Sequence, residues 1–345
     1  MPWDEGLVNS LVYDRPDPGE GRVLSYAQAI NEALALALEN DPSVFVLGQG
    51  VDDPLAMFGT TRGLPARFGP SRVFDTPLSE EAMMGVSAGA AMNGMRPVFM
   101  HNRPDFVLLA FNQLVTHAAK FHFMDNGQTT VPMVVWAAIG RGWGSGAQHS
   151  QAIQGMLLGV PGLKIVMPST PYDAKGLLLS AILDNNPVCV FEHRWLMKKD
   201  GVVPKGLYRV PIGKGIYRRR GADVTIVGAS HAIELGVQAA TALASDGIDA
   251  EVIDLRTVKP LDESILLESL RKTGRVVAVD TAWMKGGVCA EIGCLAAEKG
   301  YRDLKAPVRR VGLPDIPTPA GYTLEQFYYP DAARIARAAR EIVRE

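Results

Sequence analysis

Two carboxylates are placed where they could do chemistry. Glu80 and Glu81 occupy the first turn of a predicted helix, just after Asp75-Thr76-Pro77 ends a predicted strand. In an isolated helix, two acids there simply complement the positive end of the helix dipole. In open α/β proteins, however, ligands bind at the carboxyl ends of the strands, where a carboxylate could act on them. Both interpretations stay open from these residues alone.

A glycine-rich loop, residues 140–151, ends in a second candidate, His149. Gly142-x-Gly144-x-x-Ala147 formally matches a relaxed dinucleotide-binding pattern after a strand. That pattern expects an acid about 20 residues later to hold the ribose, and residues 126–172 contain no Asp or Glu. An NAD-dependent oxidoreductase is therefore the weaker alternative. A lone loop histidine is itself more often a surface residue than a catalyst.

Motifs for metal binding and for other nucleophiles are absent from the sequence. It contains no H-E-x-x-H, no P-loop and no G-x-S-x-G motif. His117 and His122 are five residues apart, with no carboxylate between them. The three cysteines cannot form a disulfide framework, so we expect buried thiols in a reducing compartment.

The elements that must position these residues alternate along the chain. Apolar strands near residues 44–48, 72–74, 97–100, 132–137, 163–167 and 187–191 alternate with helices near 26–39, 79–93, 106–120, 151–158 and 171–183. Ser25 with Gln28 forms a capping box, and Thr170 with Pro171 is a second helix start. A similar alternation resumes after residue 221. The pattern predicts an α/β fold with mainly parallel sheets covered on both faces.

Length and composition set the limits of the interpretation. The chain has 345 residues, 47% apolar and 21% charged, and a net charge of −2. We expect a polar leader over 1–21, an α/β domain over 22–200, a linker over 201–220 and a second α/β domain over 221–345. Near-neutral charge argues against nucleic-acid binding, and the leader lacks a signal-peptide core. No apolar run is long enough to span a membrane, so we expect a cytoplasmic protein.

A set of strings, in order and well spaced, carries a family resemblance. They are Asp75-Thr-Pro-Leu-Ser-Glu80, Gly89-Ala-Ala, Gly94-Met-Arg-Pro97, Gln148-His149-Ser-Gln151, Asp184-Asn-Asn-Pro187 and Arg256-Thr257. From about Gly21 onward the chain resembles the beta subunit of the thiamine-diphosphate-dependent decarboxylating component of 2-oxo acid dehydrogenase complexes, of the pyruvate and branched-chain type. The resemblance implies a pyrimidine-binding transketolase-like domain followed by a C-terminal transketolase-like domain.

The resemblance also implies roles for particular residues. The counterpart of Glu80 hydrogen-bonds a ring nitrogen of the cofactor's aminopyrimidine, which promotes loss of the proton from the thiazolium carbon. Phe106 matches the aromatic residue that stacks on the pyrimidine, and Gln49 stands where the family often has a cofactor-side glutamate. His149 matches the active-site histidine near the substrate or the incoming acceptor. Glu80 and His149 are thus the implied catalytic residues.

A structural potassium site is implied as well. It would use backbone oxygens and two side chains: Met133, Ala181, Ile182, Asp184 and Asn186. Oxygen ligands suit a hard cation. The residues alone favour an ordinary turn that ends a helix.

One absence points to a partner. The Gly-Asp-Gly element that holds Mg²⁺ and the diphosphate in thiamine-diphosphate enzymes does not occur here. In this family it lies on an alpha subunit, which implies an alpha-2/beta-2 heterotetramer with the cofactor shared between chains. The small-residue helix after Glu80 is a candidate subunit contact.

The implied function is cleavage of a 2-oxo acid or ketose with transfer of the acyl unit. The acceptor would be a lipoyl acyltransferase, an acyl carrier protein or a small molecule. Departures from the family at Gln49, Met100 and Trp136 border the expected active site and leave the substrate open. The alternatives are a transketolase-like two-carbon transfer in specialised metabolism, the NAD-dependent oxidoreductase, and a non-catalytic scaffold subunit.

Overall fold

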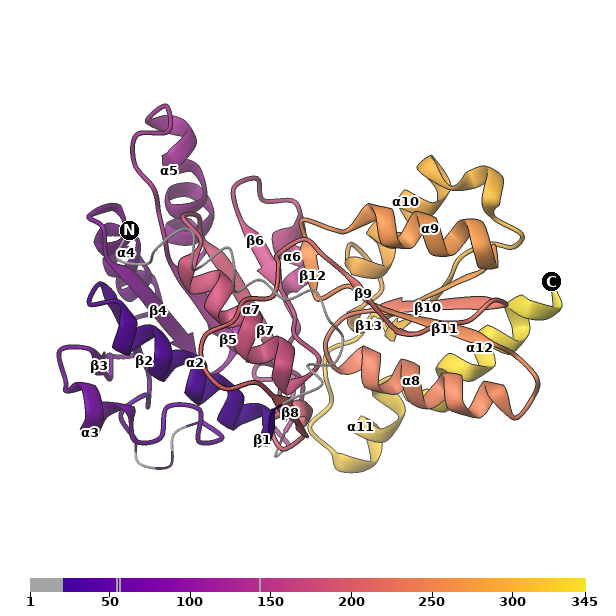
Figure 1. Ribbon diagram of the computed structural model, residues 1–345, viewed down its shortest axis with the longest axis horizontal. Helices are drawn as coiled ribbons and strands as arrows, with labels where there is room; N and C mark the ends of the chain where they lie inside the picture. Colours follow the sequence, from indigo (N-terminus) through magenta and orange to yellow (C-terminus); the bar gives the residue numbers. More distant parts are fainter. Residues whose placement is uncertain (1–20, 54, 56, 143) are drawn as a thin grey trace. The chain divides into compact units, whose positions relative to one another are not determined.

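The computed structural model describes residues 21–53, 55, 57–142 and 144–345. The predicted leader lies outside the described residues except for Gly21, and so does Trp143 of the glycine-rich loop. The chain forms two compact units (Figure 1). The first unit comprises the described residues up to Ile139 and Val160–Ile212, and the second comprises Gly140–Gly159 and Gly213–Glu345. The glycine-rich loop, which we expected within the first domain, thus groups with the second unit.

The first unit is built on a parallel sheet, as predicted. Its strands are β2 (Val44–Gly48), β3 (Val73–Phe74), β4 (Arg96–His101), β5 (Val134–Ile139), β6 (Lys164–Val166) and β7 (Val188–His193). They lie side by side in the order β6-β7-β5-β4-β2-β3. A separate antiparallel pair joins β1 (Arg22–Ser25) to β8 (Asp200–Val203), so residues 201–203 of the expected linker form part of a strand.

Two capped helices cover one face of this sheet. Helices α2 (Tyr26–Asn40) and α7 (Pro171–Leu183) pack against each other and against the apolar side chains of β2, β4, β5 and β7 (Figure 1). The capping box of Ser25 and Gln28 is present, and Thr170 accepts a hydrogen bond from Asp173 N. Both predicted helix starts are confirmed. Each depends on a hydrogen bond between residues only three positions apart, so the sequence alone can indicate it.

Helix α4 (Glu80–Met92) packs against irregular helices that follow β4. The single helix predicted near residues 106–120 is wrong in detail. The chain forms a 3₁₀ helix η1 (Pro104–Ala110), a π-helical segment η2 (Asn112–Ala118) and α5 (Ala119–Met124). The small side chains of α4 bring the two segments close, and at Gly85 an added Cβ would lie 3.7 Å from the Gln113 side chain. Tertiary packing of this kind overrides the periodicity on which the prediction relied.

The second unit has its own sheet, ordered β14-β13-β10-β11-β9. Its strands are β9 (Ile216–Arg219), β10 (Val224–Gly228), β11 (Ala250–Asp254), β13 (Val276–Trp283) and β14 (Arg309–Leu313), with β9 antiparallel and the others parallel. Helices α8 (His231–Ala244) and α12 (Ala332–Arg344) share one core cluster with the sheet. The remaining elements are α6 (Gln154–Leu158), β12 (Thr257–Lys259), α9 (Glu263–Thr273), α10 (Val288–Lys299), the 3₁₀ helix η4 (Tyr301–Asp303) and α11 (Tyr322–Tyr328).

The cysteines follow the prediction in part. Cys189 and Cys289 are buried, but Cys294 is exposed, contrary to the expectation of buried thiols. Cys294 follows Cys289 by five residues on α10, which turns it well away from the buried face. Among the described residues, no helix combines the length and the apolar character needed to cross a membrane.

Candidate active site

Glu80 stands at the carboxyl edge of the first unit's sheet, within reach of Gln49. Glu80 is the first residue of α4, and Gln49 directly follows β2. The Gln49 Nε2 atom donates to Glu80 Oε1 at 3.3 Å. Oε2 of the half-buried Glu80 has no hydrogen-bond partner among the residues that the structure describes. One carboxylate oxygen is therefore available to a ligand donor.

The loop that carries Gln49 is fixed from both sides. Asp75, which follows β3, accepts hydrogen bonds from the backbone N–H groups of Gly50 and Thr76, each at 2.8 Å. Asn102, which follows β4, donates to the carbonyl oxygen of Gln49 at 3.0 Å. Three neighbouring strand ends thus hold this loop, as the topology of a parallel sheet allows.

Gly48 makes the close approach of β2 and β4 possible. Its φ is +142°, and an added Cβ would lie only 2.3 Å from the carbonyl oxygen of Met100. Other residues avoid such a backbone conformation. A glycine at the last residue of β2 therefore places Gln49 directly beside the end of β4.

Phe106 lies on η1, which packs against α4. Its side chain is half-buried. The first unit thus brings the element that carries Phe106 to the helix that begins with Glu80. The stacking role of Phe106 stays a prediction.

His101, the last residue of β4, is a neutral group in this region. Burial lowers the pKa of His101 to about 3. Its ring lies 4.2 Å from that of Phe99, and its Nε2 atom has no hydrogen-bond partner among the described residues. An uncharged imidazole here can donate or accept a hydrogen bond but is not positively charged at neutral pH.

His149 belongs to the second unit and is half-buried there. Its backbone N–H approaches the carbonyl oxygen of Gly146 at 3.5 Å, at the end of a turn in the loop. The catalytic role of His149 stays a prediction.

Met100 and Trp136 are core residues of the first unit. Their side chains are 1% and 0% exposed and belong to the cluster beneath α2 and α7. We expected both to border the active site. Side chains alternate between the two faces of a strand, and these two point to the face covered by α2 and α7. The sequence alone does not show which face a given side chain occupies.

Two buried acids were not identified from the sequence. Glu192 on β7 accepts a 2.7 Å hydrogen bond from Trp136 Nε1, and burial raises the pKa of Glu192 to about 8. In the second unit, Asp280 on β13 accepts a 3.0 Å hydrogen bond from Gln154, and burial raises the pKa of Asp280 to about 7. Both acids follow apolar residues in a strand, a signal that could have drawn attention to them.

Comparison with known proteins decides the family. Residues 22–199 match the pyrimidine-binding domain of transketolase, and residues 213–335 match the C-terminal domain of transketolase. The chain is 42% identical over 322 residues to the 2-oxoisovalerate dehydrogenase subunit beta of Bacillus subtilis, covering 93% of this chain and 98% of that one.

The chain belongs to the transketolase-like beta subunits of the 2-oxo acid dehydrogenase type.

A second relative of this beta-subunit family is equally similar. The acetoin:2,6-dichlorophenolindophenol oxidoreductase subunit beta of Cupriavidus necator is 42% identical over 333 residues, with 94% of this chain and 98% of that one covered. A solved structure described as a split-gene transketolase, an inactive beta4 tetramer, superposes with a TM-score of 0.74. It covers 93% of this chain and 98% of its own, and at 23% identity it supports the fold alone.

The residues implied as potassium ligands take part in hydrogen bonds and an ion pair within this beta subunit. Arg96 Nη1 donates to the carbonyl oxygens of Ile182 and Asp184 at 2.8 and 3.0 Å. The Asp184 side chain pairs with Lys164 and accepts hydrogen bonds from Asn186. Carbonyl oxygens of the other two residues, Met133 and Ala181, accept backbone hydrogen bonds from Val188 and Asp184.

Two side-chain cations thus lie within the implied ligand set. Because like charges repel, Arg96 and Lys164 do not favour an additional cation at the same oxygens. The potassium site stays a prediction. Among the described residues, no group of three or more His, Cys, Asp or Glu side chains is placed to hold a metal ion.

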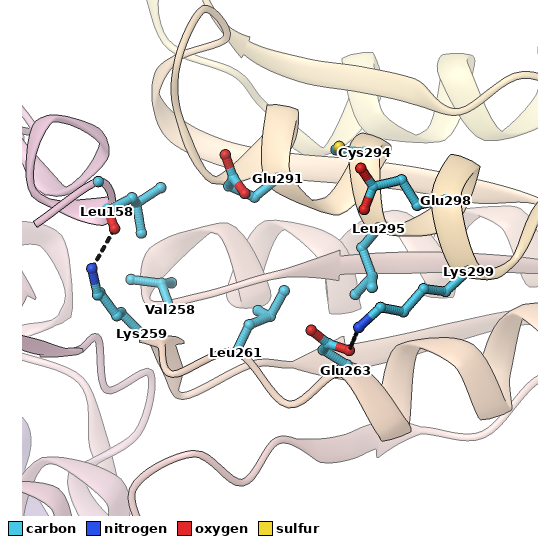
Figure 2. A pocket seen from close by; sticks show the side chains of 11 residues that line it. Leu158, Val258, Lys259, Leu261, Glu263, Glu291, Cys294, Leu295, Glu298 and Lys299 are labelled. Carbon is cyan, nitrogen blue, oxygen red and sulfur yellow. Dashed lines mark hydrogen bonds and ion pairs between the residues drawn. The ribbon is translucent and has the colours of Figure 1, made fainter. Parts of the chain in front are cut away.

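The second unit also contains a pocket of about 330 Å³ (Figure 2). It is bordered by the end of α6, the segment around β12 and helix α10. Lys299 pairs with Glu263, and Lys259 donates to the carbonyl oxygen of Leu158 (Figure 2). None of the predicted catalytic or cofactor-binding residues lines this pocket.

Proposed function

We propose that this chain is the beta subunit of a heteromeric thiamine-diphosphate enzyme that cleaves a bond next to a carbonyl and transfers the acyl unit. The donor we favour is a 2-oxo acid, which is decarboxylated. The observation that carries the proposal is the placement of Glu80 at the start of α4, with one oxygen held by Gln49 and the other available.

The residues around Glu80 fit the pyrimidine half of the cofactor. Oε2 of Glu80 is available to a ring nitrogen that donates a hydrogen bond. Gln49 supplies an uncharged amide that donates a hydrogen bond to this carboxylate. Phe106 lies on the element that packs against α4 and would contribute an apolar ring surface.

Each residue of this chain then has a defined task. When bound, thiamine diphosphate supplies a nucleophilic carbon and an electron sink. Glu80 hydrogen-bonds the pyrimidine ring and thereby favours transfer of a proton within the site. Gln49 holds the Glu80 carboxylate in orientation. His149 would donate a hydrogen bond or a proton to the substrate or to the acyl acceptor.

A partner chain must complete the site. The sequence contains no Gly-Asp-Gly element, so we propose that an alpha subunit holds Mg²⁺ and the diphosphate in an alpha-2/beta-2 assembly. The acyl acceptor would be a lipoyl acyltransferase or an acyl carrier protein. A cytoplasmic location is part of this proposal and rests on the low cysteine content. The potassium site is not used in it.

The test is reconstitution with a candidate alpha subunit that carries the Gly-Asp-Gly element. Wild type and a Glu80→Gln variant are compared for cofactor binding by calorimetry and for turnover of a panel of 2-oxo acids. We expect both complexes to assemble and only the wild type to turn over. Full turnover by Glu80→Gln would remove Glu80 from the mechanism, and an active complex built on Glu80→Ala would favour the scaffold alternative.

A second candidate substrate class has specific support. The equally similar relative from Cupriavidus necator is named for acetoin, which is a hydroxyketone rather than a 2-oxo acid. A transketolase-like transfer of a two-carbon unit from a hydroxyketone or ketose phosphate is therefore the alternative. The same panel, extended to these donors, separates the two: release of CO₂ identifies the 2-oxo acid reaction.

A further inference from the structure

The loop with His149 is held by the second unit, although it directly follows β5 of the first. Gly140, Gly144 and Gly146 adopt positive φ values of 88°, 67° and 64°. Glycine gives a loop many accessible backbone conformations, so such a loop does not hold one shape by itself. Contacts from outside the loop must therefore define its conformation.

An ion pair at the beginning of the loop provides the first such contact. Arg141 Nη1 lies 2.6 Å from Glu325 Oε2 on α11, and the two side chains are only 16% and 3% exposed. The guanidinium carbon of Arg141 also lies 5.5 Å from the centre of the Tyr329 ring. Charges in such a buried position depend on each other, because removal of one leaves the other without its counter-charge in a poorly solvated place.

Contacts further along the segment keep it close to the same unit. A Cβ added to Gly144 or Gly146 would lie 3.3 Å from an atom of Ala320. Beyond His149, the buried side chain of Gln154 donates to Asp280. Near the end of the segment, Lys259 donates a hydrogen bond to the carbonyl oxygen of Leu158 (Figure 2). The loop is thus held before and after His149.

We propose that Arg141 and Glu325 are positioning residues, whose ion pair anchors the loop to the second unit and sets the orientation in which His149 is presented to the reacting groups. The part concerning His149 rests on the proposed function. The anchoring itself rests on the contacts within the second unit. Neither residue needs to touch substrate or cofactor to act in this way.

Hydrogen–deuterium exchange of the full chain tests the anchoring without any activity. We compare wild type with Arg141→Ala and with Glu325→Gln, which is nearly isosteric and serves if Arg141→Ala fails to fold. Lys285→Ala is the control, because it removes an exposed ion pair with Asp315 in the same unit. We expect exchange at residues 140–151 to accelerate at least about tenfold in the anchor variants only. Unchanged exchange at this loop, or an equal loss of protection throughout the second unit, would overturn the proposal.

Turnover by the complex with the alpha subunit tests the link to His149. Arg141→Ala should lower kcat by about tenfold or more in the wild-type background and have little further effect in His149→Ala. Independent, additive losses would overturn the positioning role. If His149→Ala is fully active, the proposed function of His149 fails, whereas the exchange experiment still decides the anchoring.

Discussion

Trp136 Nε1 donates a 2.7 Å hydrogen bond to Glu192 Oε2, and both side chains are completely buried. They lie on the adjacent parallel strands β5 and β7. Oε1 of Glu192 has no hydrogen-bond partner among the described residues. Because burial raises the pKa of Glu192 to about 8, this acid is mainly protonated at neutral pH. A tryptophan of the core is thus paired with an uncharged acid.

This pair predicts a particular pH dependence of stability. The folded pKa of Glu192 lies above its ordinary value of 4.5, so the folded state holds the proton more tightly than the unfolded state. Its stabilising contribution is complete below about pH 4.5 and is lost as the pH rises to about 8, with a slope of up to ~1.4 kcal/mol per pH unit. Glu192→Gln should remove this slope. Urea unfolding of both proteins between these pH values measures it, and parallel pH curves would contradict the assignment.

Arg96 should be a major contributor to the stability of the first unit. Besides Ile182 and Asp184, its guanidinium contacts Asn185 Oδ1 at 2.9 Å and approaches the buried Asp41 at 3.7 Å. Arg96→Met removes all of these contacts at once and should lower the free energy of unfolding by about 3–5 kcal/mol. The control is Arg67→Met, which breaks a more exposed pair with Glu39 and should cost less than about 1 kcal/mol. Equal losses in the two variants would refute the assignment.

Gly48→Ala should disturb the start of the Gln49 loop. The added methyl group would overlap the Met100 carbonyl oxygen, and φ at this position is unfavourable for alanine. We expect a loss of about 2 kcal/mol or more in the free energy of unfolding. Gly159→Ala is the matched control, because its φ is −76° and no atom of the described residues other than its chain neighbours lies within 4 Å of its added Cβ. Thermal unfolding of both variants measures the difference, and equal midpoints would show that β2 and β4 can separate at no cost.

The small-residue helix α4 can be tested as a subunit contact. Among the described residues, no atom outside the adjacent residues and the backbone of α4 lies within 4 Å of a Cβ added at Gly89, so the chain alone should tolerate Gly89→Leu. If the alpha subunit packs closely here, this variant should weaken assembly by about tenfold or more. Analytical ultracentrifugation with the alpha subunit measures the affinity, with Gly159→Leu as control. Wild-type affinity for Gly89→Leu would place the partner elsewhere.

Local sequence signals, such as helix caps and apolar periodicity, predicted much of the fold. They did not predict features that depend on packing between distant segments. Ser25 with Gln28 and Thr170 with Pro171 fix helix starts within a few residues, so sequence alone located them. The π-helical segment η2 (Asn112–Ala118) packs against α4, and the periodicity of apolar residues did not predict it. Helix and strand boundaries differ by one or two residues at most other places.

The candidate site shows the same division. Glu80 was selected because its helix follows a strand near the carboxyl edge of a parallel sheet, and Gln49 was selected through the family resemblance. The structure brings the two side chains within 3.3 Å. Asn102 carries the same signal and was overlooked. The Arg141–Glu325 pair joins residues that are 184 positions apart, so no local pattern could predict it.

The most direct test of the account is turnover by the alpha–beta complex carrying Gln49→Glu or Glu80→Gln, compared with wild type. The account predicts that Glu80→Gln still assembles and binds thiamine diphosphate but loses at least about 100-fold in kcat, as expected when a catalytic acid–base group is removed. Gln49→Glu, which puts a second carboxylate beside Glu80, should lose less and change the pH profile. Wild-type kcat in the Glu80→Gln complex would contradict the central claim.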